Sequence, residues 1–234
     1  MSLSELKKVL KSMTNKEKAI IMQRYFKTGK GEYGEGDVFI GLTVPEQRKI
    51  AKQLSDLSLD SLKELVYSEI HEERLIALLI LVNRFHKADE KGRKDIFDFL
   101  IKNRKQINNW DLVDLTAPKT IGEYLLEKDK TVLFKLALSK NVWDRRIAMM
   151  STFPSIRKCE FQTAFKLAEK LLQDDHDLIQ KAVGWMLREI GKIDMKSEET
   201  FLKKYYRKMP RTMLRYSIEK FPEIKRKKYL NGKI

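Results

Sequence analysis

An indole and two carboxylates lie close together in the segment NNWDLVDLTAP, residues 108–118, of a chain that is otherwise strongly basic. Trp110 and Asp114 are four residues apart, so in a helix they share one face, about one turn from each other. The face of an indole attracts cations, and a carboxylate stabilises positive charge that develops beside it. The pair could therefore serve a cationic ligand, whereas a single tryptophan on a helix can also simply pack in the core.

Two further tryptophans, Trp143 and Trp185, lie in the segments NVWDRRIAMM and IQKAVGWMLREIG. Basic residues accompany both of them: Arg145, Arg146, Lys181 and Arg188. Trp143 stands at the start of its helix, so we expect it to pack in the core. Asp111, beside Trp110, is expected to be a first-turn acid that the helix dipole favours. Asp114 lies inside its helix, before the break that TAPKT predicts, and a structural role explains it less well.

Other kinds of chemistry have no motif in the sequence. The chain lacks a phosphate-binding GxxxxGK[ST] loop, a GxGxxG fingerprint after a strand and an HExxH zinc motif. The three histidines (His71, His86 and His176) have no paired histidine or cysteine near them, so we expect no metal site and no cofactor. Cys159 has no base nearby and is expected to be a small core residue. A Ser–His–Asp triad stays open, because its members need not be close in sequence.

The elements that must position these residues are amphipathic helices. Segments such as SLKELVYSEI, KGRKDIFDFLIKNR and TAFKLAEKLLQ place apolar residues three and four positions apart. No segment alternates in the way that a half-buried strand does. Residues 29–41, with five glycines, are expected to form a long loop. The sequence therefore predicts an all-α protein.

A period of about 35 residues runs through these helices. One cationic or aromatic position recurs, at Arg74, Trp110, Arg146, Lys181 and either Arg215 or Tyr216. The steps are 36, 36, 35 and 34 or 35 residues, and each long helix follows a shorter one. Because the consensus residues of tetratricopeptide and ankyrin repeats are absent, the pattern indicates HEAT-like repeats, which align equivalent positions on one concave surface. We expect one domain, residues 1–234, folded as a right-handed α-α superhelix with a concave basic groove.

The charge of the chain favours an anionic partner. Its 48 Lys and Arg against 33 Asp and Glu give a net charge of +15, and residues 201–234, with 12 basic and 2 acidic residues, carry +10 of it. Such a field attracts nucleic acid or an anionic surface, and a solvated cationic face is the alternative. One cysteine, no signal peptide and no apolar run of membrane-spanning length predict a soluble cytoplasmic protein without membrane contact.

The segments NNWDLVD, NVWDRRIA and IQKAVGWMLREIGK, in this order and at this spacing, resemble the bacterial DNA alkylation repair glycosylases of the AlkD type. The segments VPEQRKIAKQ and MPRTMLRYSIEKFP are similar to the same family, so the resemblance covers roughly residues 15–230. It implies a HEAT-like repeat protein of the bacterial cytosol that associates with the nucleoid. The implied activity is base excision repair, in which a hydrolase removes 3-methyladenine and 7-methylguanine from double-stranded DNA.

The resemblance also implies roles for individual residues. It places the catalytic carboxylate at Asp114, the paired aromatic groups at Trp110 and Trp185, and the groove arginine at Arg146. The residues expected to bind DNA are basic and lie in the long helices or in the C-terminal segment: Lys181, Arg145, Arg188, Arg211, Arg215, Lys203 and Lys204. The protein is expected to act as a monomer. The alternatives are a module that only binds damaged or branched DNA, and a scaffold whose basic face meets an acidic protein.

The chemistry of an alkylated purine fits such residues. The base already carries a positive charge, so it leaves without protonation by a general acid, and positive charge then develops at C1′ of the sugar. One carboxylate can stabilise that charge and orient the attacking water. Each indole can contribute roughly 0.5–2 kcal/mol to binding a cation. On this interpretation the acid and the indoles serve a local cation, and the basic residues hold phosphates; the sequence leaves open whether the base is flipped out.

Overall fold

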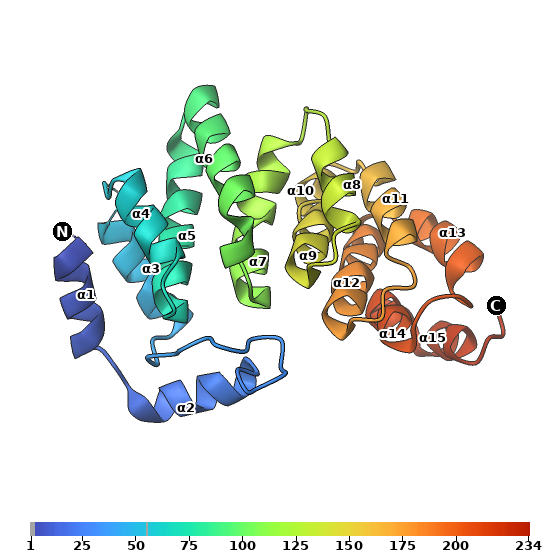
Figure 1. The fold of residues 1–234 in the computed structure, drawn as a ribbon. Helices are drawn as coiled ribbons and strands as arrows, with labels where there is room; N and C mark the ends of the chain where they lie inside the picture. The colour runs from blue at the N-terminus through green and yellow to red at the C-terminus, as the bar shows by residue number, and fades with distance from the viewer. Residues whose placement is uncertain (1–2, 55) are drawn as a thin grey trace. The chain divides into compact units, whose positions relative to one another are not determined.

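The protein is helical in the part of the chain that the structure, a computed structural model, describes: residues 3–54 and 56–234 (Figure 1). These ranges hold no named strand, only an isolated parallel bridge between Val38 and Ile70. The prediction of an all-α fold is confirmed. No described helix combines the length and the apolar character needed to cross a membrane.

The chain folds into two compact units, Met1–Thr116 and Ala117–Ile234, and each is described by itself. The helices of the first unit are α1 (Leu3–Ser12), α2 (Lys16–Tyr25), α3 (Val44–Gln53), α4 (Leu59–Val66), α5 (His71–Lys87), α6 (Glu90–Asn103), the 3-10 turn η1 (Arg104–Gln106) and α7 (Trp110–Thr116). The helices of the second are the π-helical turn η2 (Pro118–Gly122), α8 (Thr131–Ala137), α9 (Val142–Met150), α10 (Phe153–Arg157), α11 (Gln162–Lys170), α12 (Asp177–Ile193), α13 (Met195–Tyr205), α14 (Arg211–Ser217), the 3-10 turn η3 (Ile218–Lys220) and α15 (Glu223–Leu230). The single continuous domain expected from the sequence stays a prediction.

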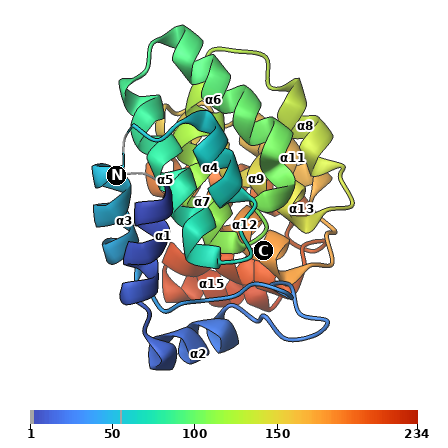
Figure 2. The same cartoon turned by 60° about the vertical axis from the view of Figure 1, so that its left-hand side comes forward.

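Helix α5 is the core of the first unit. Every residue from 71 to 82 is buried, whereas a helix at a protein surface keeps an exposed stripe. Helices α3, α4, α6 and α7 pack around it (Figure 2). Its first turn is polar even though it is buried, with His71, Glu72, Glu73 and Arg74 all less than 9% exposed. Buried charges need partners, and the glycine-rich loop and α7 supply them.

The glycine-rich loop, residues 26–43, connects α2 with α3 and is fastened to α5. Three of its glycines have φ between 79° and 90°, a conformation that residues with a Cβ rarely adopt: Gly31, Gly36 and Gly41. The Glu72 carboxylate accepts hydrogen bonds from the backbone N–H groups of residues 40–42 at 2.8–3.2 Å. The predicted long loop is therefore confirmed, and it is held against the core by a buried acid.

The second unit consists of two layers of helices. Helix α12 lies between α9 and α14 in one layer, and α8, α11 and α13 form the other (Figure 1). Gly184 permits the close packing of α12 on α14, because a Cβ there would lie 2.5 Å from Met213 O and from Tyr216 Cβ. Trp143 in α9 is 6% exposed, which confirms its predicted place in the core.

The predicted repeat positions fall within the first five residues of five helices: Arg74 in α5, Trp110 in α7, Arg146 in α9, Lys181 in α12 and Arg215 in α14. Each of these helices follows another one, namely α4, α6, α8, α11 and α13, so the helical-repeat prediction is confirmed. The expectation that the first helix of each pair is shorter is wrong for two pairs. Helices α6 and α13 have 14 and 11 residues, whereas α7 and α14 have 7 each.

Two local expectations were wrong. The segment TAPKT does not break the helix, because Ala117 keeps helical angles and the chain passes into the π-helical turn η2. Pro118 stands at the first position of that turn, where its missing N–H costs nothing. Cys159 is exposed rather than in the core. It follows the last turn of α10 with φ of 63°, in a left-handed turn position at the surface.

Candidate functional site

Helix α7 exposes one side, which carries the predicted site residues. Trp110, Asp114 and Leu115 are half-buried, whereas the other residues from 111 to 116 are buried. Trp110 is the first residue of the helix, and its backbone N–H donates to Asn109 Oδ1 at 2.8 Å. The predicted shared face of Trp110 and Asp114 is thus present, and both side chains are partly accessible.

Two aromatic residues that the sequence analysis did not single out surround Trp110. The Phe26 ring stacks on the indole with centroids 5.1 Å apart and planes 10° apart. The Tyr25 ring meets the indole edge-on, with centroids 6.0 Å apart and an angle of 76°. Since Phe26 covers one face of the indole, the opposite face is the one that a ligand could use. In the sequence, only the adjacent aromatic residues Tyr25 and Phe26 could have indicated an aromatic cluster around Trp110.

A buried polar network lies beneath this site. The His71 ring nitrogens meet two carboxylates, with Nδ1 3.0 Å from Asp37 Oδ2 and Nε2 2.9 Å from Asp111 Oδ2. Arg74 Nη2 donates to Asp37 Oδ1 at 2.6 Å, and Asn109 Nδ2 donates to Asp37 Oδ2 at 3.1 Å. Asp111 lies in the first turn of α7 as expected, but it is buried and ion-paired, so its role exceeds that of an acid favoured by a helix dipole.

The network shifts the pKa values of His71 and Asp37. Burial alone would lower the pKa of His71, but the charge and hydrogen bond of Asp111 and the hydrogen bond of Asp37 outweigh burial and the nearby Arg74, so the pKa is raised above 6.5. Burial alone would raise the pKa of Asp37, but the bonds from His71 and Asn109 and the charge of Arg74 lower it below 3.8. The network therefore favours the charged form of both groups.

The prediction that Arg74 faces an open groove is wrong. Its side chain is 4% exposed, and besides Asp37 it donates from Nη1 to Ser68 O at 2.8 Å. A guanidinium in this position neutralises a buried acid. The period correctly identified an equivalent place in the helix, but not the direction of the side chain.

In the second unit, Trp185 is half-buried in α12, directly after the glycine that packs on α14. Its Nε1–H donates to Glu189 Oε1 at 2.9 Å, one turn further along the helix. Lys181, one turn before it, is half-buried and lies 2.5 Å from Asp177 Oδ2. The predicted grouping of an indole with a cation at one-turn spacing is present, and both members have acidic partners on the same helix.

The three predicted arginines of α9 and α12 are held by protein partners. Arg146 is 5% exposed and donates to Leu178 O at 2.5 Å, so the prediction that it faces an open groove is wrong. Arg145 donates to both carboxylate oxygens of Asp174, and Arg188 pairs with Glu219. These contacts connect α9 with the start of α12, and α12 with the 3-10 turn η3. A role of Arg145 and Arg188 in binding DNA stays a prediction.

The predicted basic residues of the C-terminal segment are divided between the two layers. Arg211 and Arg215 are exposed on α14, in the same layer as Trp185. Lys203 and Lys204 are exposed on α13, in the other layer. Helical packing rather than sequence position decides this division, and the expectation that these residues bind DNA stays a prediction.

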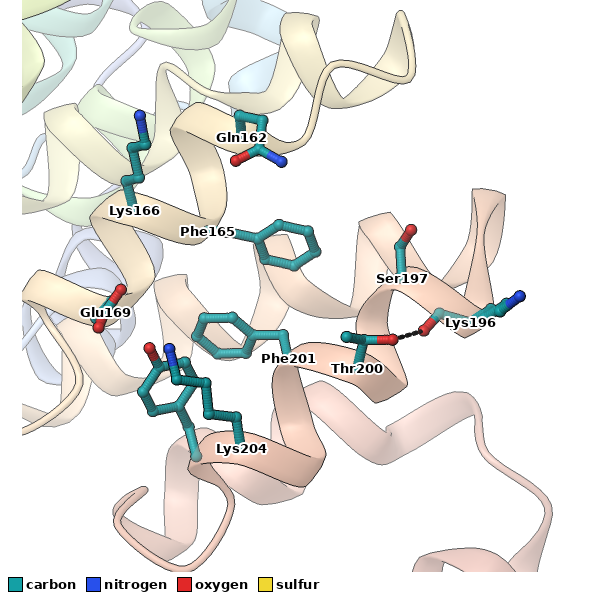
Figure 3. Close-up of a pocket in the computed structure, with 10 residues that line it drawn as sticks. Gln162, Phe165, Lys166, Glu169, Lys196, Ser197, Thr200, Phe201 and Lys204 are labelled. Carbon is teal, nitrogen blue, oxygen red and sulfur yellow. Dashed lines mark hydrogen bonds between the residues drawn. The ribbon is translucent and has the colours of Figure 1, made fainter.

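Lys204 lines a separate open cavity of about 700 Å³ between α11 and α13 (Figure 3). The rings of Phe165 and Phe201 stack in its floor, with centroids 5.2 Å apart and planes 11° apart. Lys166 and Lys196 are the other cations of its lining. The cavity holds no indole and no buried acid, so its chemistry differs from that of the α7 site.

The described residues contain no group of His, Cys, Asp and Glu side chains arranged to hold a metal ion. Both ring nitrogens of His71 are occupied by carboxylate oxygens of Asp37 and Asp111. The chemistry available in α7 is that of an indole face and a half-buried carboxylate.

Comparison with known proteins agrees with the fold. The chain is similar to a predicted DNA alkylation repair enzyme from Enterococcus faecalis, with a TM-score of 0.70 and 20% identity over 90% of this chain and 97% of that chain. This likeness concerns the fold. No curated protein matches the chain. The model of the family described as DNA alkylation repair enzyme matches residues 6–221, and so the chain belongs to that family.

Proposed function

We propose that the protein is a monofunctional DNA glycosylase that hydrolyses the N-glycosidic bond of cationic alkylated purines in double-stranded DNA. The family supports a role in alkylation repair, with DNA as the partner. The observation that carries the finer proposal is the half-buried pair of Trp110 and Asp114 on one face of α7. A protein that only holds phosphates gains nothing from a carboxylate on its binding surface, because the charges repel.

The proposed reaction needs no cofactor. The bond between C1′ and the alkylated base breaks, its electron pair goes to the base, and the base leaves neutral. Water then forms a bond to C1′ and loses a proton, which gives the free sugar at an abasic site. Asp114 is proposed to stabilise the oxocarbenium-like charge at C1′ and to orient and deprotonate the water. No lysine has a place in this scheme, so strand cleavage by a lyase step is not expected.

The indoles are proposed to contact the cationic nucleotide. Trp110 is half-buried, with the Phe26 ring stacked on one face of its indole and the Tyr25 ring in edge contact with it, so the proposed contact uses the face opposite Phe26. Trp185 offers a half-buried indole of the same kind in the second unit. Cation–π contacts of roughly 0.5–2 kcal/mol each favour 3-methyladenine and 7-methylguanine over neutral bases.

The phosphates are proposed to bind cations of the α12 and α14 layer, namely the half-buried Lys181 and the exposed Arg211 and Arg215. Their binding should weaken as salt rises, because phosphate contacts release counterions. Action as a monomer and a place in the bacterial cytosol near the nucleoid belong to the same proposal. A module that only binds damaged DNA would share these contacts and lack the reaction.

The test is release of base from methylated duplex DNA, under single-turnover conditions, by the wild type and by Asp114→Asn. The variant keeps shape, so DNA affinity should stay within about twofold, while excision should fall about 10²-fold or more. Asp98→Asn is the control, since Asp98 is an exposed acid of α6 paired with Lys94. Equal excision by Asp114→Asn and the wild type would remove the catalytic assignment, and no excision by the wild type would favour the binding module.

A further inference from the structure

The proposed chemistry leaves unexplained why charged groups are buried under α7. Asp37, His71 and Asp111 are 4%, 1% and 5% exposed. Taking an ion out of water costs several kcal/mol unless partners compensate, and an apolar core of the same volume is often at least as stable. Stability alone therefore does not explain the network, and its geometry suggests another use.

The geometry determines the charge of His71. A carboxylate oxygen only accepts hydrogen bonds, so a ring nitrogen 3.0 or 2.9 Å from it has to carry a proton. Both nitrogens face such oxygens, so with both acids ionised the ring is an imidazolium. Together with Arg74 it balances the two carboxylates. The charged groups that face the ring are Asp37 from the glycine-rich loop, Arg74 from α5 and Asp111 from α7.

The network holds the beginning of α7 at two residues, one on each side of Trp110. Asp111 binds His71, and Asn109 donates to Asp37 while it accepts the N–H of Trp110. Three segments that lie far apart in the chain meet here: the loop, the first turn of α5 and the first turn of α7. A seven-residue helix has little stability of its own, so such anchors decide its position.

Aromatic rings connect the same histidine to the indole. The Phe39 ring stacks on His71 with centroids 4.4 Å apart and planes 22° apart. The Phe26 ring lies 5.2 Å from His71 and stacks on Trp110 at 5.1 Å. The plane of the indole is therefore set by a ring that itself rests against the imidazolium.

We propose that His71 is a positioning residue, which as a buried imidazolium between Asp37 and Asp111 holds α7 so that Trp110 and Asp114 meet the substrate. This rests on the proposed function. Loss of one ring proton would leave a nitrogen lone pair facing a carboxylate, and the first turn of α7 would lose its anchor. Because the pKa of His71 is raised in the folded protein, this anchor is fully present below the ordinary pKa of 6.5 and is lost as pH rises through the raised pKa.

The first experiment uses the wild-type protein and does not depend on excision. Side-chain nitrogen NMR reads the protonation of each histidine, and His71 is assigned by elimination with His86→Gln and His176→Gln. We expect both His71 nitrogens to be protonated near neutral pH, and the indole N–H signal of Trp110 to shift with the same pH midpoint as His71. The proposal is overturned if His71 is neutral near neutral pH, or if the indole N–H signal of Trp110 does not change as His71 titrates.

The second experiment compares His71→Gln with His86→Gln, a change at an exposed histidine of α5. Glutamine can donate to one carboxylate but carries no charge. Single-turnover excision should fall about tenfold or more in His71→Gln, because small misplacements of reacting groups are costly, while DNA affinity stays within about twofold. The wild-type rate is expected to decline as pH rises through the pKa of His71, and this decline should be absent in His71→Gln. A rate and pH profile equal to those of His86→Gln overturn the proposal.

Asp111→Asn is the second variant, in case His71→Gln does not fold, and the same loss of rate and of pH dependence is expected. An unchanged rate and profile in Asp111→Asn would likewise overturn the proposal. The outcomes separate the two proposals. If the wild type releases no base, the glycosylase function fails, whereas the NMR experiment still decides whether His71 positions Trp110.

Discussion

Glu198 offers a test of the structure that is independent of DNA. It is 1% exposed on α13, its Oε1 has no hydrogen-bond partner, and a Cβ at Gly191 of α12 would overlap its Oε2. Burial raises the pKa of this carboxyl to about 9, with the charge of Glu199 acting in the same direction and Arg188 opposing it. The glycine of α12 thus makes room for a carboxyl that is protonated in the folded protein.

The raised pKa of Glu198 makes the stability of the fold depend on pH. Between the ordinary pKa of 4.5 and the folded value of about 9, the folded state holds a proton that the unfolded state has released. Stability therefore falls as pH rises across this window, by about 1.4 kcal/mol per pH unit. At pH 7 the free energy of unfolding is therefore lower than at acid pH by about 3 kcal/mol. Glu198→Gln removes the titration, so the variant should be more stable by up to that amount.

The assay is urea unfolding at about pH 5, 7 and 9, with Trp110→Phe as the common background. Fluorescence then reports on Trp143 and Trp185, both in the second unit with Glu198. The gain in free energy of unfolding from Glu198→Gln should be small at about pH 5 and should increase as pH rises. Glu127→Gln, an exposed acid of the same unit, is the control. If Glu198→Gln and the control lose stability with pH at the same rate, the carboxyl is ionised in the fold and the reasoning is refuted.

Two further predictions concern the second unit. Gly184→Ala should lower the free energy of unfolding by about 1–3 kcal/mol, because the new Cβ meets Met213 O at 2.5 Å, and urea unfolding measures this directly; no loss would mean that α14 can shift freely. Arg215→Ala should reduce the salt slope of DNA binding by about 1, whereas Lys203→Ala with Lys204→Ala should leave it unchanged, because α13 lies in the other layer. Equal slopes for both changes would contradict this division.

The helices and their period were predictable because they depend on local patterns. Apolar residues at helical spacing decide that a segment is a helix, and the step of 34–36 residues from Arg74 to Arg215 marks equivalent turns. The core position of Trp143 followed from its place at a helix start. The shared exposed face of Trp110 and Asp114 followed from their four-residue spacing, since helix geometry alone fixes it.

Side-chain direction and partners were not predictable, because they depend on contacts between distant segments. Arg74 and Arg146 occupy the expected turns but point into the protein, toward Asp37 and Leu178 O. His71 seemed isolated, since its two acidic partners lie 34 and 40 residues away in sequence. Cys159 is exposed because a left-handed turn carries it to the surface.

The segment WDLVD has two functions on the two sides of one short helix. Its exposed side presents Trp110 and Asp114, the residues proposed to meet the lesion, and its buried side presents Asp111, which binds His71. A helix of seven residues cannot hold itself in place, so the buried acid is needed to place the exposed one. The two carboxylates of α7 therefore have separate explanations. Asp114 is proposed to stabilise a cation that appears only during the reaction, and Asp111 pairs with the His71 ring of the folded protein.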